Sequence, residues 1–232
     1  PKYRYDTSLD NVLAELDQVS GTSDSYKNDP PKIIFEEKNS VLVSFDGDPK
    51  LSEDKDLGVE RVLNTPFIVI KLKNDSHYFL YVGSRWFSAA AVSGPWNYVR
   101  QESPTLKSVA QKIDANQHTP PISLDSLPYI VTSTVPAELI QSNGQPNFAP
   151  VAGTNLLYMS NSHDNIFMYI SSQMYYVLLS GRWYRASNLH GNWEYVAPTA
   201  LPADFAKIPE GSPKDVVLAS VPGTPAAKEA VI

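Results

Sequence analysis

The chain has 232 residues, a formal net charge of −6 and no cysteine. Its hydrophobic content of 42% excludes a disordered chain, and the sequence has no run of about 18 apolar residues that would cross a membrane. The lack of cysteine excludes a disulfide scaffold, a zinc–thiolate site and a thiol nucleophile, and the acidic balance argues against a nucleic-acid partner.

The first 50 residues predict one helix and two strands. Residues 8–19 carry leucine and valine at helical spacing, with Thr7 or Ser8 as the N-cap, which predicts an amphipathic helix. The runs 31–37 and 41–45 are rich in β-forming residues and predict strands. A turn sequence, Asp-Gly-Asp-Pro, follows the second run directly.

Two later segments predict antiparallel hairpins. In each, two aromatic and β-branched runs are separated by two residues, one of them glycine, which is a strong signal for a tight turn. A further glycine turn leads into a short third run that begins with tryptophan, so each segment predicts a three-stranded meander. The runs are 78–82, 85–89 and 96–99 in the first segment and 175–179, 182–186 and 193–196 in the second.

The C-terminal part is punctuated by proline. Thr224 and Pro225 form an N-cap and first-turn pair, which predicts a short helix after them. The segment 201–209, LPADFAKIP, has no counterpart at the matching place in the first half of the chain. The chain begins at Pro1 and ends on three apolar residues, so we expect it to continue into a longer protein.

An internal repeat relates the two halves at a constant offset of 97 residues. Between 78–99 and 175–196, eight of the 22 positions are identical, and the repeat contains all four tryptophans. The sequence therefore predicts a mainly β (α+β) fold of two tandem homologous units built on three-stranded meanders, with an N-terminal helix and short C-terminal helical pieces. The predicted domains are an N-terminal helix and loop, two repeats, a linker between them and an extension: 1–30, 31–116, 117–127, 128–213 and 214–232.

The usual catalytic patterns are absent from the sequence. It contains no nucleophile elbow, P-loop or dinucleotide-binding glycine pattern, and its four histidines stand apart from one another. The acidic stretch 46–56 resembles a calcium loop, but lysine and leucine occupy positions where ligands and glycine are required, which favours a solvated loop. We therefore predict a protein that is not an enzyme and that uses no cofactor or metal.

The repeated aromatic and arginine residues are the candidate ligand-binding set. Tyrosine and tryptophan rings can stack on the apolar faces of sugars, and arginine can donate hydrogen bonds to hydroxyl groups. The alternative is that the tryptophans form the core of each small β-unit. The candidate residues are Trp86, Trp96, Trp183, Trp193, Tyr98, Tyr195, Arg85 and Arg182.

The motif GRWYRA at 181–186, followed by GNW at 191–193, resembles the family 5/12 carbohydrate-binding modules of bacterial chitinases and cellulases. The wider pattern, with the segments LPADFAKIP and SVPGTPAAKEAVI, is similar to long exported bacterial repeat proteins labelled carbohydrate-binding family V/XII, for which no activity is established. The resemblance implies an exported bacterial protein, periplasmic or extracellular, with glycan or cell-wall polymer as a partner. The aromatic pair that contacts ligand in the chitin-binding modules is replaced here by Ala90-Ala91 and Ser187-Asn188.

Two hypotheses of function follow. The first is a non-enzymatic binding module of a larger exported protein, which predicts exposed and roughly coplanar rings in each repeat. The second is a structural repeat that mediates self-assembly or binds a partner protein. It predicts buried tryptophans and an apolar seam on the second half, where residues 117–232 carry 13 charged residues against 31 in residues 1–116.

Overall fold

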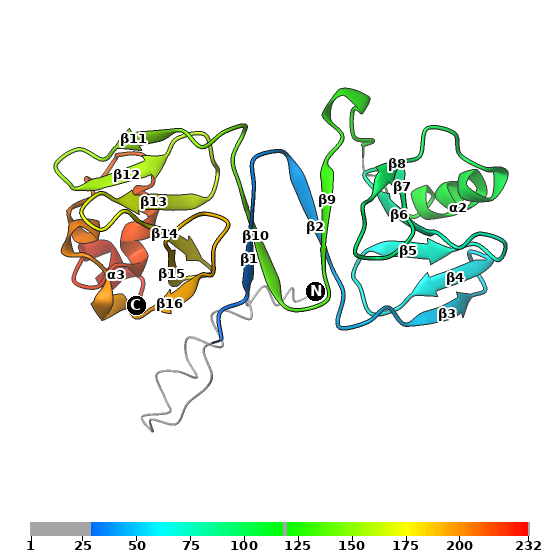
Figure 1. Cartoon of the computed structure of the whole chain (residues 1–232), viewed down its shortest axis with the longest axis horizontal. Helices are drawn as coiled ribbons and strands as arrows, with labels where there is room; N and C mark the ends of the chain where they lie inside the picture. Colours follow the sequence, from blue (N-terminus) through cyan, green and yellow to red (C-terminus); the bar gives the residue numbers. More distant parts are fainter. Residues whose placement is uncertain (1–28, 118–119, 232) are drawn as a thin grey trace, which may run out of the picture. The chain divides into compact units, whose positions relative to one another are not determined.

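The computed structural model describes residues 29–117 and 120–231, so the helix predicted over 8–19 lies outside the described part. The protein is mainly β and contains two six-stranded antiparallel sheets (Figure 1). The chain divides into two compact units, of which the described residues include 31–145 and 146–231. Each unit contains one of the two large sheets.

The sheet of residues 31–145 is a meander in which every strand pairs with the one before it. Its last three strands are the predicted hairpin and third strand. The strands are β3 (Leu51–Asp54), β4 (Val59–Val62), β5 (Ile68–Lys71), β6 (Tyr78–Val82), β7 (Arg85–Ala89) and β8 (Asn97–Tyr98).

The sheet of residues 146–231 repeats this meander at the same offset of 97 residues. The register is repeated as well, since Leu51 pairs with Val62 and the equivalent Phe148 pairs with Met159. The strands are β11 (Phe148–Pro150), β12 (Leu156–Met159), β13 (Asn165–Tyr169), β14 (Met174–Leu179), β15 (Arg182–Ala186) and β16 (Glu194–Val196).

The two predicted hairpins are confirmed. Leu80 pairs with Phe87 across β6 and β7, and the equivalent Val177 pairs with Tyr184 across β14 and β15. Both residues of each tight turn have a positive φ, as a type I′ turn requires: 56° and 59° at Gly83 and Ser84, and 48° and 75° at Ser180 and Gly181. The meanders have six strands rather than three because the short, partly polar runs that precede each hairpin also form strands.

The two strands predicted near the start of the chain are also confirmed, but they pair outside the meander. β1 (Lys32–Glu36) pairs in parallel with β10 (Ala137–Gln141), and β2 (Ser40–Ser44) pairs in parallel with β9 (Tyr129–Ser133). We call these four strands the strand joint (Figure 1). Because β9 and β10 belong to the second repeat by sequence, the compact unit 31–145 extends beyond the first repeat.

Helix α2 (Pro104–Asp114) lies in the stretch before the predicted linker and was not predicted. Its signals are present in the sequence: the Ser103 side chain caps Leu106 N–H, and Leu106, Val109 and Ile113 form a buried stripe. This stripe packs on the sheet face that carries Trp86. Figure 1 shows α2 beside β6 and β7.

In residues 146–231, short helical turns replace α2. Phe205, Ile208 and Val217 from these turns pack on the sheet face that carries Trp183. The predicted helix after Thr224 is confirmed as α3, and the Thr224 Oγ1 caps Ala227 N–H at 3.1 Å. The elements are η2 (Pro198–Ala200), η3 (Ala203–Lys207), η4 (Asp215–Ser220) and α3 (Pro225–Glu229), and η1 (Leu124–Ser126) lies before β9. No helix within the described residues has the length and apolar character needed to cross a bilayer.

Tyr81 ties the end of α2 to the sheet. Its hydroxyl donates to the carboxylate of Asp114, with distances of 2.9 and 2.8 Å to the two oxygens. Burial, and then the hydrogen bond to Asp114, raises the pKa of Tyr81 to about 12. The neutral phenol is therefore the form that the folded protein favours.

This raised pKa predicts a loss of stability in alkaline solution. The contribution of Tyr81 is fully present below its ordinary pKa of about 10, and it is lost as the pH rises through the folded-state pKa of about 12. Urea unfolding of the wild type and of Tyr81→Phe at pH 9, 10 and 11 measures this. We expect a steeper fall with pH in the wild type, and equal slopes would contradict the assignment.

Candidate functional site

All four tryptophans of the candidate set are buried. Their side chains are 0% (Trp86), 7% (Trp96), 1% (Trp183) and 6% (Trp193) exposed. Trp86 belongs to the cluster under α2, and Trp96 belongs to the cluster on the other face of the same sheet. Both indoles therefore pack within the core of their own sheet.

Equivalent aromatic residues make equivalent contacts in the two repeats. The Trp96 indole N–H donates to the Val92 carbonyl at 3.1 Å, and the Trp193 indole N–H donates to the Leu189 carbonyl at 3.4 Å. Tyr98 meets the ring of Phe87 edge-on with centroids 6.0 Å apart, and Tyr195 meets the ring of Tyr184 in the same way at 6.2 Å. Each of these side chains therefore serves the packing of its own repeat.

The two arginines of the set lie at the tips of the hairpins. Arg85 Nε donates to the Ile122 carbonyl at 2.9 Å, and Ile122 N–H donates to the Gly83 carbonyl at 2.8 Å. A Cβ at Gly83 would lie 2.1 Å from Ile122 Cδ1, so only glycine allows this approach. Arg85 thus holds the predicted linker against the first hairpin, whereas Arg182 is exposed at the equivalent tip.

Trp86 and Trp183 are equivalent in sequence but differ in their hydrogen bonding. The Trp183 indole N–H donates to the Ser220 carbonyl of η4 at 2.8 Å. The Trp86 indole N–H is buried without a hydrogen-bond partner. The covering elements explain the difference, since α2 uses its own backbone carbonyls in helical bonds whereas the end of η4 leaves a carbonyl free to accept.

This difference predicts unequal effects of the same substitution. Trp183→Phe removes a made hydrogen bond and should lower the free energy of unfolding by about 1–3 kcal/mol more than Trp86→Phe, which removes an unsatisfied donor. Urea unfolding followed by far-ultraviolet circular dichroism measures both variants without relying on tryptophan emission. An equal loss in the two variants would contradict the difference in bonding.

No acidic or histidine cluster suited to metal binding is found in residues 29–117 and 120–231. The stretch 46–56, which resembles a calcium loop in sequence, forms a turn followed by strand β3. Asn64 organises that turn, because its Nδ2 donates to the carbonyls of Asp46 and Asp48 and its Oδ1 accepts from Lys50 N–H, each at 2.8 Å. The backbone carbonyl and N–H groups of this turn are therefore hydrogen-bonded by an amide side chain.

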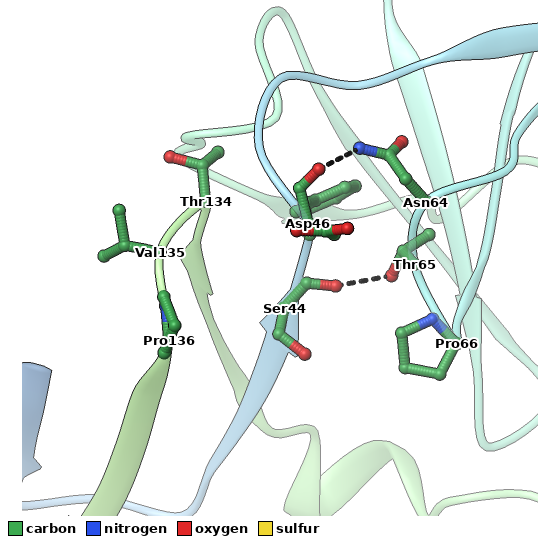
Figure 2. Close-up of a pocket in the computed structure, with 9 residues that line it drawn as sticks. Ser44, Asp46, Asn64, Thr65, Pro66, Thr134, Val135 and Pro136 are labelled. Carbon is green, nitrogen blue, oxygen red and sulfur yellow. Dashed lines mark hydrogen bonds between the residues drawn. The ribbon is translucent and has the colours of Figure 1, made fainter. Parts of the chain in front are cut away.

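A groove lies beside this turn, where β2 ends and β9 turns into β10 (Figure 2). Its volume is about 440 Å³, and the hydroxyl of one lining residue, Thr65, donates to the carbonyl of another, Ser44, at 2.7 Å. Exposed Val135 forms part of its rim. The side chains of Asn64 and Thr65 are hydrogen-bonded to the backbone, and Asp46 is the sole ionisable residue that lines the groove. The lining therefore does not place a nucleophilic side chain beside a general base.

A second hollow contains an exposed aromatic ring, that of Tyr129, which the repeat pattern of the sequence does not predict. Tyr129 is 43% exposed, and the Lys38 ammonium lies 3.7 Å from its ring centroid. Asn39 and Asp125 line the same hollow. No repeat signal marks Tyr129, because the equivalent position in the first repeat is Lys32.

Comparison with known proteins does not assign this chain to a family. No family model, curated protein or solved structure matches this chain.

Proposed function

We propose that this chain is a non-enzymatic assembly module of a larger exported bacterial protein, in which the tryptophan motif is the core of each repeat. The burial of all four tryptophans carries the proposal, because it favours a packing role over stacking on a sugar. The export and the bacterial origin come from the resemblance of the GRWYRA and LPADFAKIP segments alone.

The equivalence of the contacts supports the same proposal. A ligand site would need its aromatic residues at the surface, whereas Trp96 and Trp193 use their N–H groups on their own backbone in the same way. The pairing of strands from different repeats in the strand joint is the second support, because it is an association of one repeat with another.

The surface of the second half does not single out a partner. The described residues include eight exposed large hydrophobic side chains: Leu51, Leu63, Leu124, Tyr129 and Val135 in one compact unit and Ile170, Val216 and Val231 in the other. Six of these eight lie in the charge-poor second half (117–232), but three of the six belong to each unit, so they are not gathered in one unit. We therefore take the strand joint, rather than an apolar seam, as the surface that matters for assembly.

Acrylamide quenching of tryptophan fluorescence tests the proposal. The folded protein should be quenched weakly compared with the same protein in urea, and soluble chitin, cellulose and peptidoglycan fragments should leave the quenching unchanged, since the rings are 0–7% exposed. Strong quenching of the folded protein that one glycan suppresses would overturn the assembly function in favour of glycan binding. Isothermal titration with the same glycans provides an independent measurement.

A further inference from the structure

The strand joint pairs the two repeats reciprocally. At the offset of 97 residues, β9 is the equivalent of β1, and β10 is the equivalent of β2. β1 pairs with β10, and β2 pairs with β9. Each strand of one repeat therefore pairs with the equivalent, in the other repeat, of the strand next to it in sequence. The register is reciprocal as well, since Lys32 lies opposite Ala137, the equivalent of Ser40, and Ser40 lies opposite Tyr129, the equivalent of Lys32.

The hydrogen bonds just outside the paired strands are reciprocal in the same way. Phe45 N–H donates to the Ser133 carbonyl at 2.9 Å, and the equivalent Ser142 N–H donates to the Glu36 carbonyl at 3.0 Å. Two further pairs of bonds repeat the relation. They are Gly47 N–H to the Thr134 carbonyl with Gly144 N–H to the Glu37 carbonyl, and Lys32 N–H to the Pro136 carbonyl with Tyr129 N–H to the Asn39 carbonyl.

A contact in which residue i meets residue j of its partner while j meets i is the definition of a two-fold, self-complementary interface. Such interfaces normally join two copies of one chain. Here the two partners are successive repeats of a single chain. The backbone groups that form the joint do not depend on side-chain identity, so one repeat offers the same partner to any other copy of the complementary repeat.

We propose that the strand joint is a self-complementary interface through which this chain also pairs with a second copy of itself, β1 and β2 of one copy binding β10 and β9 of the other. This inference rests on the proposed function and names its partner. Exchange between chains makes the same contacts as pairing within a chain. The ratio of exchanged dimer to monomer therefore depends on the protein concentration relative to the effective concentration of the tethered repeat, which is on the order of millimolar for a short tether.

Side-chain packing holds the exchanged strands in place after pairing. Val43 of β2 and Ile130 of β9 are buried in the cluster that covers one face of the sheet β3–β8. The Gln141 side chain accepts a hydrogen bond from Ser40 N–H at 2.8 Å, which joins the start of β2 to the end of β10. A second copy that supplies β9 and β10 would complete the same cluster and the same hydrogen bond.

Engineered cysteines test the exchange in the full chain, which has no cysteine of its own. Ile34 lies opposite Leu139 in the β1–β10 pair, and both side chains are half-buried. Neighbouring strands lie about 4.8 Å apart, a spacing within the Cα range of a disulfide. Chains with Ile34→Cys are mixed with chains with Leu139→Cys, unfolded, refolded together at about 1 µM to 1 mM, and oxidised.

We expect a covalent heterodimer whose fraction rises at least about tenfold over this concentration range, since exchange competes with an effective concentration of order millimolar. The matched control mixes Ile34→Cys with Val131→Cys. Position 131 is the repeat equivalent of position 34, but it lies in β9, which pairs with β2 and not with β1. The control should give no concentration-dependent heterodimer. Leu42→Cys mixed with Val131→Cys supplies a second, independent pair from β2 and β9.

The double variant Ile34→Cys/Leu139→Cys, refolded at about 1 µM, serves as the reference and should form a disulfide within one chain. Efficient formation of that disulfide without any heterodimer at 1 mM (about the effective concentration of the tether) would overturn the exchange. Equal cross-linking in the control mixture would also overturn it. If either of these results were found while acrylamide quenched the folded protein only weakly, the proposed assembly function would stand, but with a different partner. Failure of the strand exchange is therefore distinguishable from failure of the proposed function.

Discussion

Replacing Phe205 with alanine is expected to lower the free energy of unfolding by about 3–5 kcal/mol. The Phe205 side chain is fully buried, and its ring packs edge-on against the rings of Phe167, Tyr176 and Trp183 with centroids 4.8–5.4 Å apart. Removing it leaves a cavity between η3 and the sheet and breaks three aromatic contacts, each of which contributes beyond simple area burial.

Urea unfolding followed by far-ultraviolet circular dichroism measures this loss. Val216→Ala is the matched control, because Val216 lies in the neighbouring η4 with 68% of its surface exposed and should change stability by less than about 0.5 kcal/mol. If the two variants were equally stable, η3 would not cover the tryptophan face of the second sheet.

Replacing Val43 with aspartate is expected to destabilise the protein by at least about 4 kcal/mol, which is close to the whole stability of a marginally stable domain. Val43 is fully buried in β2, among Phe45, Leu80 and other apolar residues of the cluster between the strand joint and the sheet. A carboxylate in this position would lose its hydration, and Val69 and the other apolar residues of this cluster cannot compensate its charge.

Val135→Asp is the control for this substitution. Val135 lies in the turn between β9 and β10 and is 52% exposed, so the same new charge stays hydrated there and should cost less than about 0.5 kcal/mol. Urea unfolding and resistance to limited proteolysis compare the two variants. A Val43→Asp protein as stable as Val135→Asp would show that β2 is not packed against the meander.

The two hairpins were predictable because their signals are local. A two-residue turn with glycine between apolar runs requires no information about distant parts of the chain, and the φ angles at Gly83 and Ser84 follow from that turn. The cap at Thr224 is local in the same sense. Helix α2 carries local signals of the same kind, the Ser103 cap and the stripe formed by Leu106, Val109 and Ile113, although it was not predicted.

The candidate site was less predictable. Along β7, Trp86 and Phe87 point to opposite faces, and both are buried. The alternation of side chains along β7 places an aromatic residue on each face of the sheet, but it does not tell which element covers each face. One face lies under α2 and the other under the strand joint, and only the three-dimensional arrangement of these elements distinguishes a core tryptophan from an exposed one.

The 97-residue repeat, the mainly β class, the hairpins and the C-terminal helix follow from the order of amino acids alone, because each depends on neighbouring residues or on direct comparison of two segments. The partners of β1 and β2 and the burial of the tryptophans depend instead on how distant segments pack in three dimensions. Parallel pairing joins backbone groups about a hundred residues apart, since Lys32 lies opposite Ala137, and backbone hydrogen bonds leave no mark on side-chain spacing.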